Sequence, residues 1–542
     1  MIRKKIENLI KKSLFAFQKE GILPKFEIPE IKIEKPEEKI HGDYSTNAAM
    51  IIAKIIKKNP LEIAEILGSR LKVLGSRFFE KVEVVKPGFI NFFISKEYLQ
   101  KQVREILKKG EKFGQLKIGR NIKTNVEFIS ANPTGPLHIG TGRGAFWGDC
   151  LANVLEKAGY KVSREYYNND AKNSAQIQEL GKTALGKGKS YLTLYLKKMI
   201  LELKPTLRKI TSESETGYFL AQNIFNDIKK FIQRKLKIKF NFWISEQNLY
   251  RDGKIQEIFD FLKSEGLVFK EEGAFWLDLS KFNQKDEVLI RENGQSTYFL
   301  SDIAYHKYKM ERRFKKIIDI WGADHQGHVP RMKAVMKILG FKGDFDVLIS
   351  QIVSLKGKKI SKRKGKIVSL EWLIDKVGLD VARFFYLTKS LETQMEFDLK
   401  LAKEQTEKNP VYYIQYAHTR ICGILRKIKN IEFRLQPAHL PPAKAGPIQN
   451  LGLLKHPKEL DLIKQLIRFP EIVEDTATDY QLQRIPQYAL DLATSFHQFY
   501  RDCRVLAENE NLTKARLALI LATKTVLKNA LDLMGISAPE RM

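Results

Sequence analysis

Asn125-Val-Glu-Phe-Ile-Ser-Ala-Asn-Pro-Thr-Gly-Pro-Leu-His-Ile-Gly-Thr-Gly-Arg-Gly144 joins a short apolar run to a Gly/Pro-rich turn and then to a helical segment that continues through Gly159. A short apolar run of this kind is typical of a buried strand in a parallel sheet. Strand-like runs recur at Ile317 to Trp321 and at Phe345 to Ile352, with helical stretches between them. Repeated strand–turn–helix units predict a doubly wound, Rossmann-like α/β core, which we place at residues 116–400.

Two common phosphate-binding motifs do not fit this turn. Gly135 and Gly140 have the spacing of a P-loop, but Thr141 stands where that motif needs a lysine. Gly140 and Gly142 would need a third glycine at Ala145 to make a dinucleotide fingerprint. What remains is a glycine-lined helix N-terminus that carries a histidine.

Such a turn can handle phosphate in its own way. Gly140, Gly142 and Gly144 would let a nucleotide approach the backbone, and a helix N-terminus favours negative charge. His138 could then donate a hydrogen bond to a phosphate oxygen as charge builds up in the transition state. The alternative is a turn histidine that only satisfies backbone groups.

A second signal is the basic segment Leu355-Lys-Gly-Lys-Lys-Ile-Ser-Lys-Arg-Lys-Gly-Lys366. From Lys356 to Lys366, seven of eleven residues are basic and none is acidic. So dense a positive charge favours a loop that becomes ordered when it binds polyphosphate. A solvated lysine loop or a generic RNA contact stays an alternative.

Composition sets the class of partner. The chain has 542 residues and a formal net charge of +31, which points to a polyanionic partner, although a lysine-rich proteome would also produce it. The three cysteines, Cys150, Cys422 and Cys503, are far apart and predict reduced thiols and no structural zinc. Without a signal peptide or a run long enough to span a bilayer, the sequence predicts a cytoplasmic protein with no membrane partner.

The flanking regions differ from the core. Residues 1–115 predict an α+β module with an amphipathic helix around Ile6 to Leu14, helices at Asn47 to Ile56 and Pro60 to Leu71, and two strands around Lys86-Pro87-Gly88. An insertion is expected around residues 186–290. Residues 401–542 predict an all-α domain, interrupted by a loop at Gln436 to Pro447.

Together, the histidine turn and the basic loop resemble the paired signatures of class I aminoacyl-tRNA synthetases. By that resemblance His138 to Thr141 and Lys359 to Arg363 clamp the ATP phosphates, with Thr141 and Arg363 departing from the usual last residue of each signature. The catalytic residues that the resemblance implies are His138, Thr141, Lys359, Ser361 and Lys362.

Longer motifs resemble arginyl-tRNA synthetases of the bacterial type, and the likeness covers nearly the whole chain. They are His41-Gly-Asp-Tyr-Ser-Thr-Asn-Ala-Ala49, Val126 to His138, Arg164-Glu-Tyr-Tyr-Asn-Asn-Asp170, Trp321-Gly-Ala-Asp-His-Gln-Gly-His328 and Gly535-Ile-Ser-Ala-Pro-Glu-Arg541. An arginine guanidinium has five donors in one plane and asks for carboxylates and an aromatic wall. Tyr298 and Asp302, four residues apart, would share one face of a helix.

The resemblance implies three sets of binding residues. For ATP they are His138, Gly140, Gly142, Asp324, His325, Lys359 and Lys362. For arginine they are Glu127, Ser130, Asn132, Glu246, Tyr298, Asp302 and His325. For tRNA they are Tyr412, Tyr416 and Arg420 in the helical domain, which resembles the family's anticodon-binding domain, while the N-terminal module resembles the part that contacts the tRNA elbow. For any one of these acids, a solvated surface position is the alternative, and some of the tyrosines are expected to be core packing.

The expected activity is an arginine–tRNA ligase. L-arginine and ATP would give arginyl-adenylate and pyrophosphate, and the arginyl group would then pass to tRNA(Arg) with release of AMP. Mg²⁺ would accompany ATP through its phosphates, with no protein metal site and no tightly bound cofactor. We expect a monomer. The rivals are a synthetase for another amino acid, such as cysteine or glutamine, and a catalytically silent paralogue that only binds RNA, which Thr141 favours.

Overall fold

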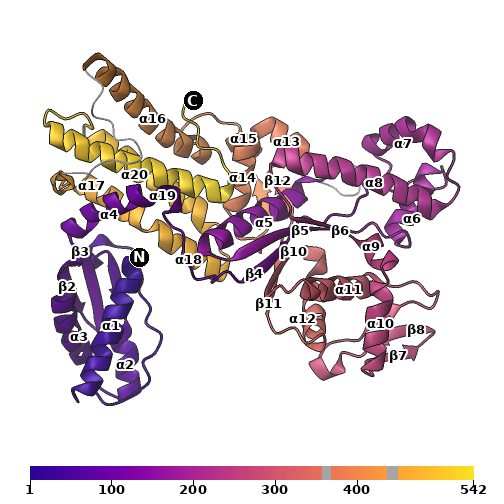
Figure 1. The fold of residues 1–542 in the computed structure, drawn as a ribbon, viewed down its shortest axis with the longest axis horizontal. Coiled ribbons are helices and arrows are strands. Elements are labelled where there is room, and N and C mark those ends of the chain that lie inside the picture. Colours follow the sequence, from indigo (N-terminus) through magenta and orange to yellow (C-terminus); the bar gives the residue numbers. More distant parts are fainter. Residues whose placement is uncertain (357–367, 436–449) are drawn as a thin grey trace.

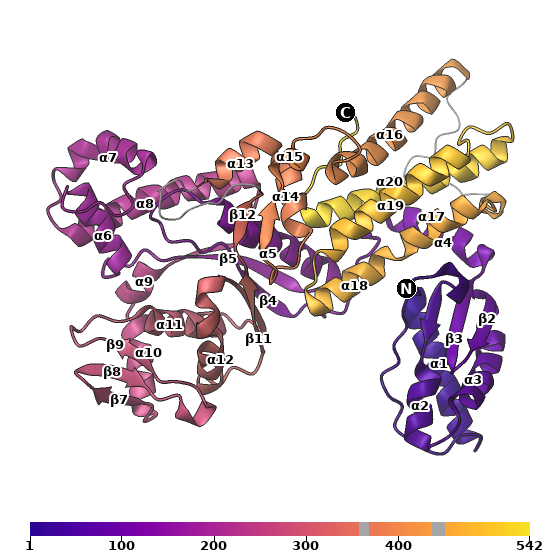
Figure 2. The ribbon, with the colours of Figure 1, turned by 180° about the vertical axis from the view of Figure 1, so that it is seen from behind.

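The computed structural model describes residues 1–356, 368–435 and 450–542. The N-terminal module lies below the C-terminal helical region, and the α/β region lies to the right of both (Figure 1). The same arrangement is seen from behind in Figure 2, with the long helices α16, α19 and α20 running side by side.

The N-terminal module is built as its sequence predicts. Its elements are α1 (Ile2–Lys19), β1 (Tyr44–Thr46), α2 (Ala48–Ile56), α3 (Pro60–Leu74), β2 (Phe79–Val85) and β3 (Phe89–Ile94), with a 3₁₀ turn at Lys39–His41. The strands form an antiparallel sheet in the order β1-β3-β2. Helix α1 buries Ile6, Ile10 and Leu14 at helical spacing, so its predicted amphipathic face is confirmed.

A parallel sheet lies at the centre of the described chain. Its strands are β4 (Lys123–Glu127), β5 (Lys161–Asn168), β6 (Phe242–Ser245), β10 (Lys316–Gly322) and β11 (Asp344–Ser350), in the order β11-β10-β4-β5-β6. The strand order reverses between β4 and β10, which is where open α/β sheets bind ligands. The predicted doubly wound core is confirmed.

The first strand is shorter than its sequence predicts. It ends at Glu127 rather than at Ser130 because Ile129 and Ser130 have φ values of 73° and 34°, which no extended strand contains. Helix α5 (Ile139–Ala158) then starts at His138 and ends at Gly159.

The segment between β5 and β10 contains two separate subregions. The first is helical: α6 (Ala175–Ala184), α7 (Leu194–Leu207), α8 (Glu213–Phe231) and a π-helical turn (Ile232–Leu236). The second has a core of its own: α9 (Glu246–Arg251), α10 (Lys254–Ser264), β7 (Val268–Glu271), β8 (Ala274–Leu277), a 3₁₀ turn (Ser280–Phe282), β9 (Glu287–Ile290) and α11 (Tyr298–Glu311). The expected insertion around residues 186–290 falls within this segment and stays a prediction.

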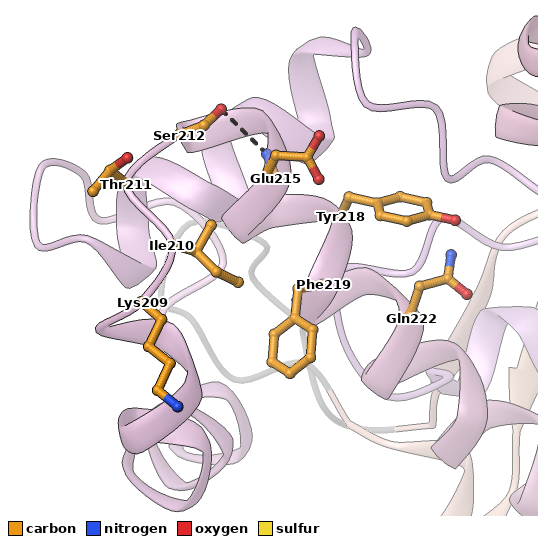
Figure 3. A pocket seen from close by; sticks show the side chains of 8 residues that line it. All are labelled: Lys209, Ile210, Thr211, Ser212, Glu215, Tyr218, Phe219 and Gln222. Atoms are coloured by element: carbon orange, nitrogen blue, oxygen red, sulfur yellow. Dashed lines mark hydrogen bonds between the residues drawn. The ribbon is translucent and has the colours of Figure 1, made fainter.

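A cavity of about 450 Å³ lies against α8 in the first subregion. Figure 3 shows Tyr218, Phe219 and Gln222 on α8, with Ile210 beside Phe219. No predicted site residue lines it.

The rest of the α/β region leads into the C-terminal helices. Its elements are a 3₁₀ segment (Ala323–His328), α12 (Val329–Ile338), β12 (Val353–Leu355), α13 (Leu370–Val377), α14 (Leu379–Leu387), β13 (Met395–Phe397) and α15 (Leu399–Ala402). The C-terminal region contains α16 (Pro410–Leu435), a 3₁₀ turn (Leu451–Leu453), α17 (Pro457–Ile467), α18 (Phe469–Asp479), α19 (Arg484–Asp502) and α20 (Glu510–Met534). The predicted all-α end is confirmed, and the predicted loop at Gln436 to Pro447 lies outside the described residues.

Helix α4 (Lys96–Lys109), followed by a 3₁₀ turn (Gly110–Lys112), links the N-terminal module to the rest. It packs on α17 and α20. All three cysteines are buried and free, as predicted. None of the helices described here has the length and apolarity needed to cross a membrane.

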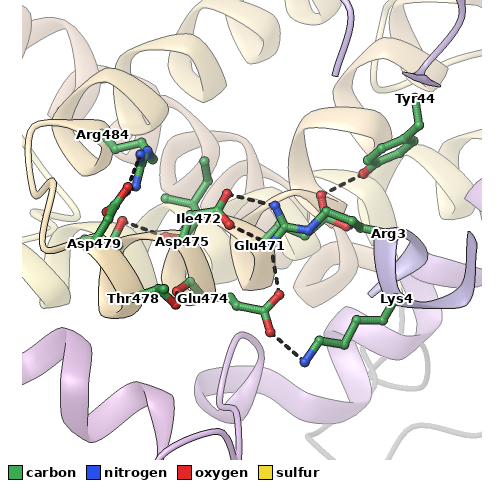
Figure 4. Close-up of polar contacts among 11 residues, drawn as sticks. Arg3, Lys4, Tyr44, Glu471, Ile472, Glu474, Asp475, Thr478, Asp479 and Arg484 are labelled. Carbon is green, nitrogen blue, oxygen red and sulfur yellow. Dashed lines mark hydrogen bonds and ion pairs between the residues drawn. The ribbon is translucent and has the colours of Figure 1, made fainter. Parts of the chain in front are cut away.

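The N-terminal module is also docked on α18 by polar contacts (Figure 4). The Arg3 guanidinium donates to Asp475 at 2.9 Å and to Glu474 at 2.8 Å. The Tyr44 hydroxyl donates to Glu471 at 2.9 Å. Because Glu471 is buried, these bonds fix the orientation of the module on the helical region.

Candidate active site

His138 occupies the N-cap of α5. Its Nδ1 accepts the backbone N–H of Gly140 at 3.1 Å, and its carbonyl accepts that of Thr141 at 2.9 Å. A Cβ at residue 140 would lie 2.9 Å from the His138 ring, so glycine is needed there for this ring position. Since Nδ1 accepts, the neutral ring carries its proton on Nε2. The side chain is exposed, and it caps the helix through Nδ1.

The structure explains the glycine at position 142 by helix packing rather than by contact with a nucleotide. It is buried, and a Cβ there would lie 2.7 Å from Leu370 and 3.1 Å from the ring of Tyr386. The missing side chain therefore lets α5 pack closely on α13 and α14. The expected approach of a nucleotide to this backbone stays a prediction.

The chain that follows the basic loop runs against the histidine turn. The N–H of Ile139 donates to the Val368 carbonyl at 3.0 Å, and the N–H of Leu370 donates to the Leu137 carbonyl at 2.9 Å. The fold therefore brings Val368 and Leu370, a few residues after the basic segment in the sequence, to the turn that carries His138. Lys359, Ser361, Lys362 and Arg363 themselves lie outside the described residues.

The loop after β4 holds a strained backbone. Ile129, a β-branched residue, has a φ of 73°, and Ser130 follows at 34°. Such conformations persist only where the surroundings impose them, and they gather at functional sites. Here the Ser130 Oγ accepts the N–H of Tyr167 at 3.1 Å, and the Asn132 Oδ1 accepts from Asn169 at 2.9 Å. The end of β5 thus fixes both predicted arginine-binding residues of this loop.

Two carboxylates without a cation form the most distinctive part of the site. Glu246 is the first residue of α9, is 2 % exposed, and its Oε2 has no hydrogen-bond partner in the described chain. Burial raises its pKa to about 7. Burial, and then the charge of Glu246, raises the pKa of Asp302 well above its usual range. Neither acid forms an ion pair with any described residue, so the pair is suited to bind a cationic ligand.

Tyr298 and Asp302 do share a helix. Tyr298 is the first residue of α11, and Asp302 lies one turn further along. Tyr298 is 43 % exposed, while Asp302 is half-buried. The helix therefore presents an aromatic ring at the rim and a carboxylate deeper inside, which confirms the shared-face prediction.

Glu127 was expected at arginine, but its described partner is a protein cation. Its carboxylate accepts from the Nζ of Lys309 at 2.5 Å, and that Nζ also donates to Asp319 at 2.7 Å. Burial lowers the pKa of Lys309, but Asp319 and Glu127 outweigh burial and raise it. His306 lies 2.8 Å from Asp319 and 2.7 Å from the Asp302 carbonyl. This buried cluster fixes α11 on the sheet, and a contact between Glu127 and arginine stays a prediction.

A second ion pair lies on the neighbouring strand, β5, where Glu165 binds Arg312. Glu165 on β5 pairs with Glu127 in the strand register, and its Oε1 accepts from Arg312 at 2.8 Å and from the Tyr305 hydroxyl at 2.6 Å. Helix α11 thus supplies Lys309, and the residue that follows the helix supplies Arg312, to acids on adjacent strands. Sequence reasoning missed this contribution because the partners are far apart in the chain.

Asp170 is a further residue whose role was missed, although it ends a quoted motif. Its carboxylate accepts from the Ser245 hydroxyl at 2.8 Å, from the Gln247 N–H at 3.0 Å and from the Gln222 amide at 2.7 Å. These bonds hold the start of α9, where Glu246 stands. Asp170 is therefore a positioning residue for that carboxylate.

Asp324 and His325 lie in the 3₁₀ segment directly after β10. Both are exposed, with His325 Nε2 3.8 Å from the Asp324 carboxylate. Since β10 and β4 are adjacent parallel strands, this segment lies at the same sheet edge as the loop of Ser130.

The predicted RNA-binding residues lie elsewhere, on α16. Tyr416 is 39 % exposed, and the Arg420 guanidinium donates to its hydroxyl at 2.7 Å. The same guanidinium lies 4.5 Å from the Tyr416 ring and 4.8 Å from the Tyr500 ring. Tyr412 is half-buried, and Tyr413 packs on the ring of His497 at 4.6 Å, as expected for a core tyrosine.

The parallel sheet, the histidine turn and the residues at the strand ends define a class I tRNA synthetase. The model of the family described as tRNA synthetases class I (R), catalytic domain, matches residues 102–175 and 202–404. The Arginyl tRNA synthetase N terminal domain matches residues 1–94, and the DALR anticodon binding domain matches residues 414–542.

Relatives that match over the whole length of the chain identify the family within this class. The chain is 41 % identical to the arginine–tRNA ligase of Caldanaerobacter subterraneus, across 100 % of this chain and 99 % of that protein. It is 40 % identical to the arginine–tRNA ligase of Bacillus subtilis, across 100 % of both. The chain belongs to the arginyl-tRNA synthetase family. Its fold is similar to that of the Thermus thermophilus arginyl-tRNA synthetase, with a TM-score of 0.78, 23 % identity and full coverage of both chains.

Proposed function

We propose that this chain is an arginine–tRNA ligase. It activates L-arginine with ATP to arginyl-adenylate and pyrophosphate, then transfers the arginyl group to tRNA(Arg) and releases AMP. The observation that carries the choice of amino acid is the pair Glu246 and Asp302, a buried and a half-buried carboxylate that form no ion pair with any described residue.

The arginine side chain supplies what this pair lacks. A guanidinium is permanently charged and planar, and it can donate to both carboxylates at once. Its binding would restore Glu246 to the ionised form despite burial, because an opposite charge favours the carboxylate. Tyr298 at the rim would cover one face of the side chain, since arginine packs well on aromatic rings. Ser130 and Asn132, held at the end of β5, would receive the α-amino and carboxylate end.

The reaction needs positioning and charge stabilisation. The arginine carboxylate attacks the α-phosphate of ATP, and pyrophosphate leaves. His138, with its proton on Nε2, would donate to phosphate oxygen as charge develops, beside Gly140 and Thr141. Asp324 and His325 would lie at the adenylate.

Lys359 and Lys362 would act on the phosphates from the other side. Their positions lie outside the described residues, and the support for them is the resemblance together with the pairing of Leu370 against the His138 turn. Mg²⁺ would arrive with ATP and be held by its phosphates. Within the described chain, no group of His, Cys, Asp and Glu side chains is arranged to hold a metal.

The tRNA would use surfaces outside this site. Tyr412, Tyr416 and Arg420 on α16 combine aromatic rings and positive charge, as base stacking and phosphate contact require. The N-terminal module would contact the tRNA elbow. We further propose domain limits at residues 1–115, 116–400 and 401–542, a cytoplasmic location and a monomeric state.

The experiment that tests this function is ATP–pyrophosphate exchange by the full chain with each amino acid, in the presence of tRNA. Exchange should depend on arginine. A response to cysteine or glutamine instead would assign the chain another amino acid, while tRNA binding without exchange or charging would support a silent RNA-binding protein.

A further inference from the structure

Tyr167 carries a buried hydroxyl that the described protein leaves without a partner. Its side chain lies at the penultimate position of β5 and is 4 % exposed, and its hydroxyl has no hydrogen bond to any described residue. Other tyrosine hydroxyls nearby are satisfied: Tyr166 donates to the Ala131 carbonyl at 3.1 Å, and Tyr305 donates to Glu165 at 2.6 Å. A buried unpaired hydroxyl is costly, so its retention calls for a ligand.

The Tyr167 ring is held rigidly. It stacks on the Tyr305 ring with centroids 4.0 Å apart and an interplanar angle of 9°. Tyr305 is itself fixed by its bond to Glu165, which Arg312 also holds. On the other side, the Tyr167 N–H donates to Ser130. The hydroxyl is therefore prepositioned rather than free to turn toward a protein partner.

The strand register and the stack on Tyr305 bring Tyr167 close to the two elements that carry Glu246 and Asp302. In the parallel pair β5–β6, Asn168 is opposite Ser245, so Tyr167 lies next to the point where β6 passes into α9 and Glu246. The Glu246 Oε2 is another buried atom without a partner. Burial first, and then the charges of Glu246 and Asp302, raise the pKa of Tyr167 well above its usual range, which places both carboxylates within electrostatic reach.

We infer that the Tyr167 hydroxyl is a third protein group on the arginine guanidinium, accepting one of its N–H donors between Glu246 and Asp302. This inference rests on the proposed function. A phenol can accept from the guanidinium while it donates its own proton to a carboxylate, so all three groups become satisfied together. Tyr167 would thus be a specificity residue, because a lysine ammonium has fewer donors and no plane in which to spread them.

Two tyrosine-to-phenylalanine variants separate this role from a structural one. Tyr167→Phe removes the unpartnered hydroxyl, and we expect the KM for arginine in pyrophosphate exchange to rise about tenfold or more, going by hydrogen bonds to charged groups. The kcat and the KM for ATP should stay within about twofold, on the same reasoning that only the guanidinium loses a contact. The thermal midpoint without ligands should not fall.

Tyr488→Phe is the matched control. It removes a buried hydroxyl on α19 that already donates to the Gln465 carbonyl at 3.1 Å, so its midpoint should fall while its KM for arginine stays close to the wild-type value. Calorimetric titration of each full-length variant with L-arginine gives the same comparison without turnover.

Four results decide the matter. The opposite pattern in the two variants, with affinity lost in one and stability in the other, supports the inference. An unchanged arginine KM in Tyr167→Phe, with an active wild type, overturns it. A Tyr167→Phe chain that is less stable or insoluble also overturns it, because the hydroxyl would then have a structural partner. If the wild type shows no arginine-dependent exchange, the proposed function itself fails.

Discussion

Replacing Glu246 with glutamine tests whether ionisation of this buried carboxylate destabilises the folded protein when no arginine is bound. The change keeps the shape of the side chain and removes only its ability to ionise. In the ligand-free protein Glu246 is 2 % exposed and forms no ion pair with a described residue. Its ionised form is therefore less stable in the folded protein than in the unfolded chain, and the glutamine variant removes that penalty.

The size of the effect follows from the pKa. Burial raises the pKa of Glu246 from 4.5 to about 7. At about 1.4 kcal/mol for each pH unit, ionising this group costs the folded protein on the order of 3 kcal/mol. Because the folded-state pKa is the higher one, its contribution to stability is full below pH 4.5 and is lost as pH rises through 7. Most of it, about 2.5 kcal/mol, should disappear between pH 5 and pH 8.

The assay is chemical denaturation of both proteins at pH 5 and pH 8, without ligands. Relative to Glu246→Gln, the wild type should lose about 2.5 kcal/mol of unfolding free energy over this interval. At pH 8 the variant should bind arginine about a hundredfold more weakly, since a charged acceptor is gone. Glu265→Gln, at an exposed site after α10, is the control and should show neither effect. A variant less stable than the wild type at pH 8, or a difference that does not change with pH, would refute the reasoning.

Three further perturbations follow from the described contacts. His138→Ala should lower aminoacylation about a hundredfold while tRNA affinity is retained, and lost tRNA binding with intact chemistry would count against its placement. Lys309→Met leaves Glu127 and Asp319 buried without a cation, and the unfolding free energy should fall by about 3–5 kcal/mol in chemical denaturation. A fall of less than about 1 kcal/mol would mean that the cluster does not anchor α11. Arg3→Ala removes the guanidinium bonds to α18, so limited proteolysis should separate the N-terminal module faster than in the wild type, and equal cleavage rates would speak against the docking role.

The elements of the fold were largely predictable because local patterns determine them. The apolar runs at Ile317 to Trp321 and Phe345 to Ile352 became strands of the parallel sheet, and the helix expected after His138 ends at Gly159. The end of β4 was predicted too late. The left-handed backbone of Ile129 and Ser130 is imposed by contacts with β5, which no local pattern of a β-branched residue reveals.

The site was predictable only where residue types and their spacing in the sequence indicate a function. Tyr298 and Asp302 lie on one helix, as their spacing predicts, whereas their contact with arginine is implied by the family resemblance and stays a prediction. The ion pair of Glu127 could not be predicted because its partner Lys309 is 182 residues away in sequence, and only the folded chain brings them together. Tyr167 and Asp170 stood in a recognised motif, but their roles depend on which polar atoms find partners after folding.

The most direct test of the central claim is aminoacylation by the purified wild-type chain with ATP, Mg²⁺, total tRNA and one labelled amino acid at a time. The account predicts that L-arginine becomes attached to tRNA and that lysine, glutamine and cysteine do not. Attachment of a different amino acid, or binding of tRNA with no attachment at all, would contradict it.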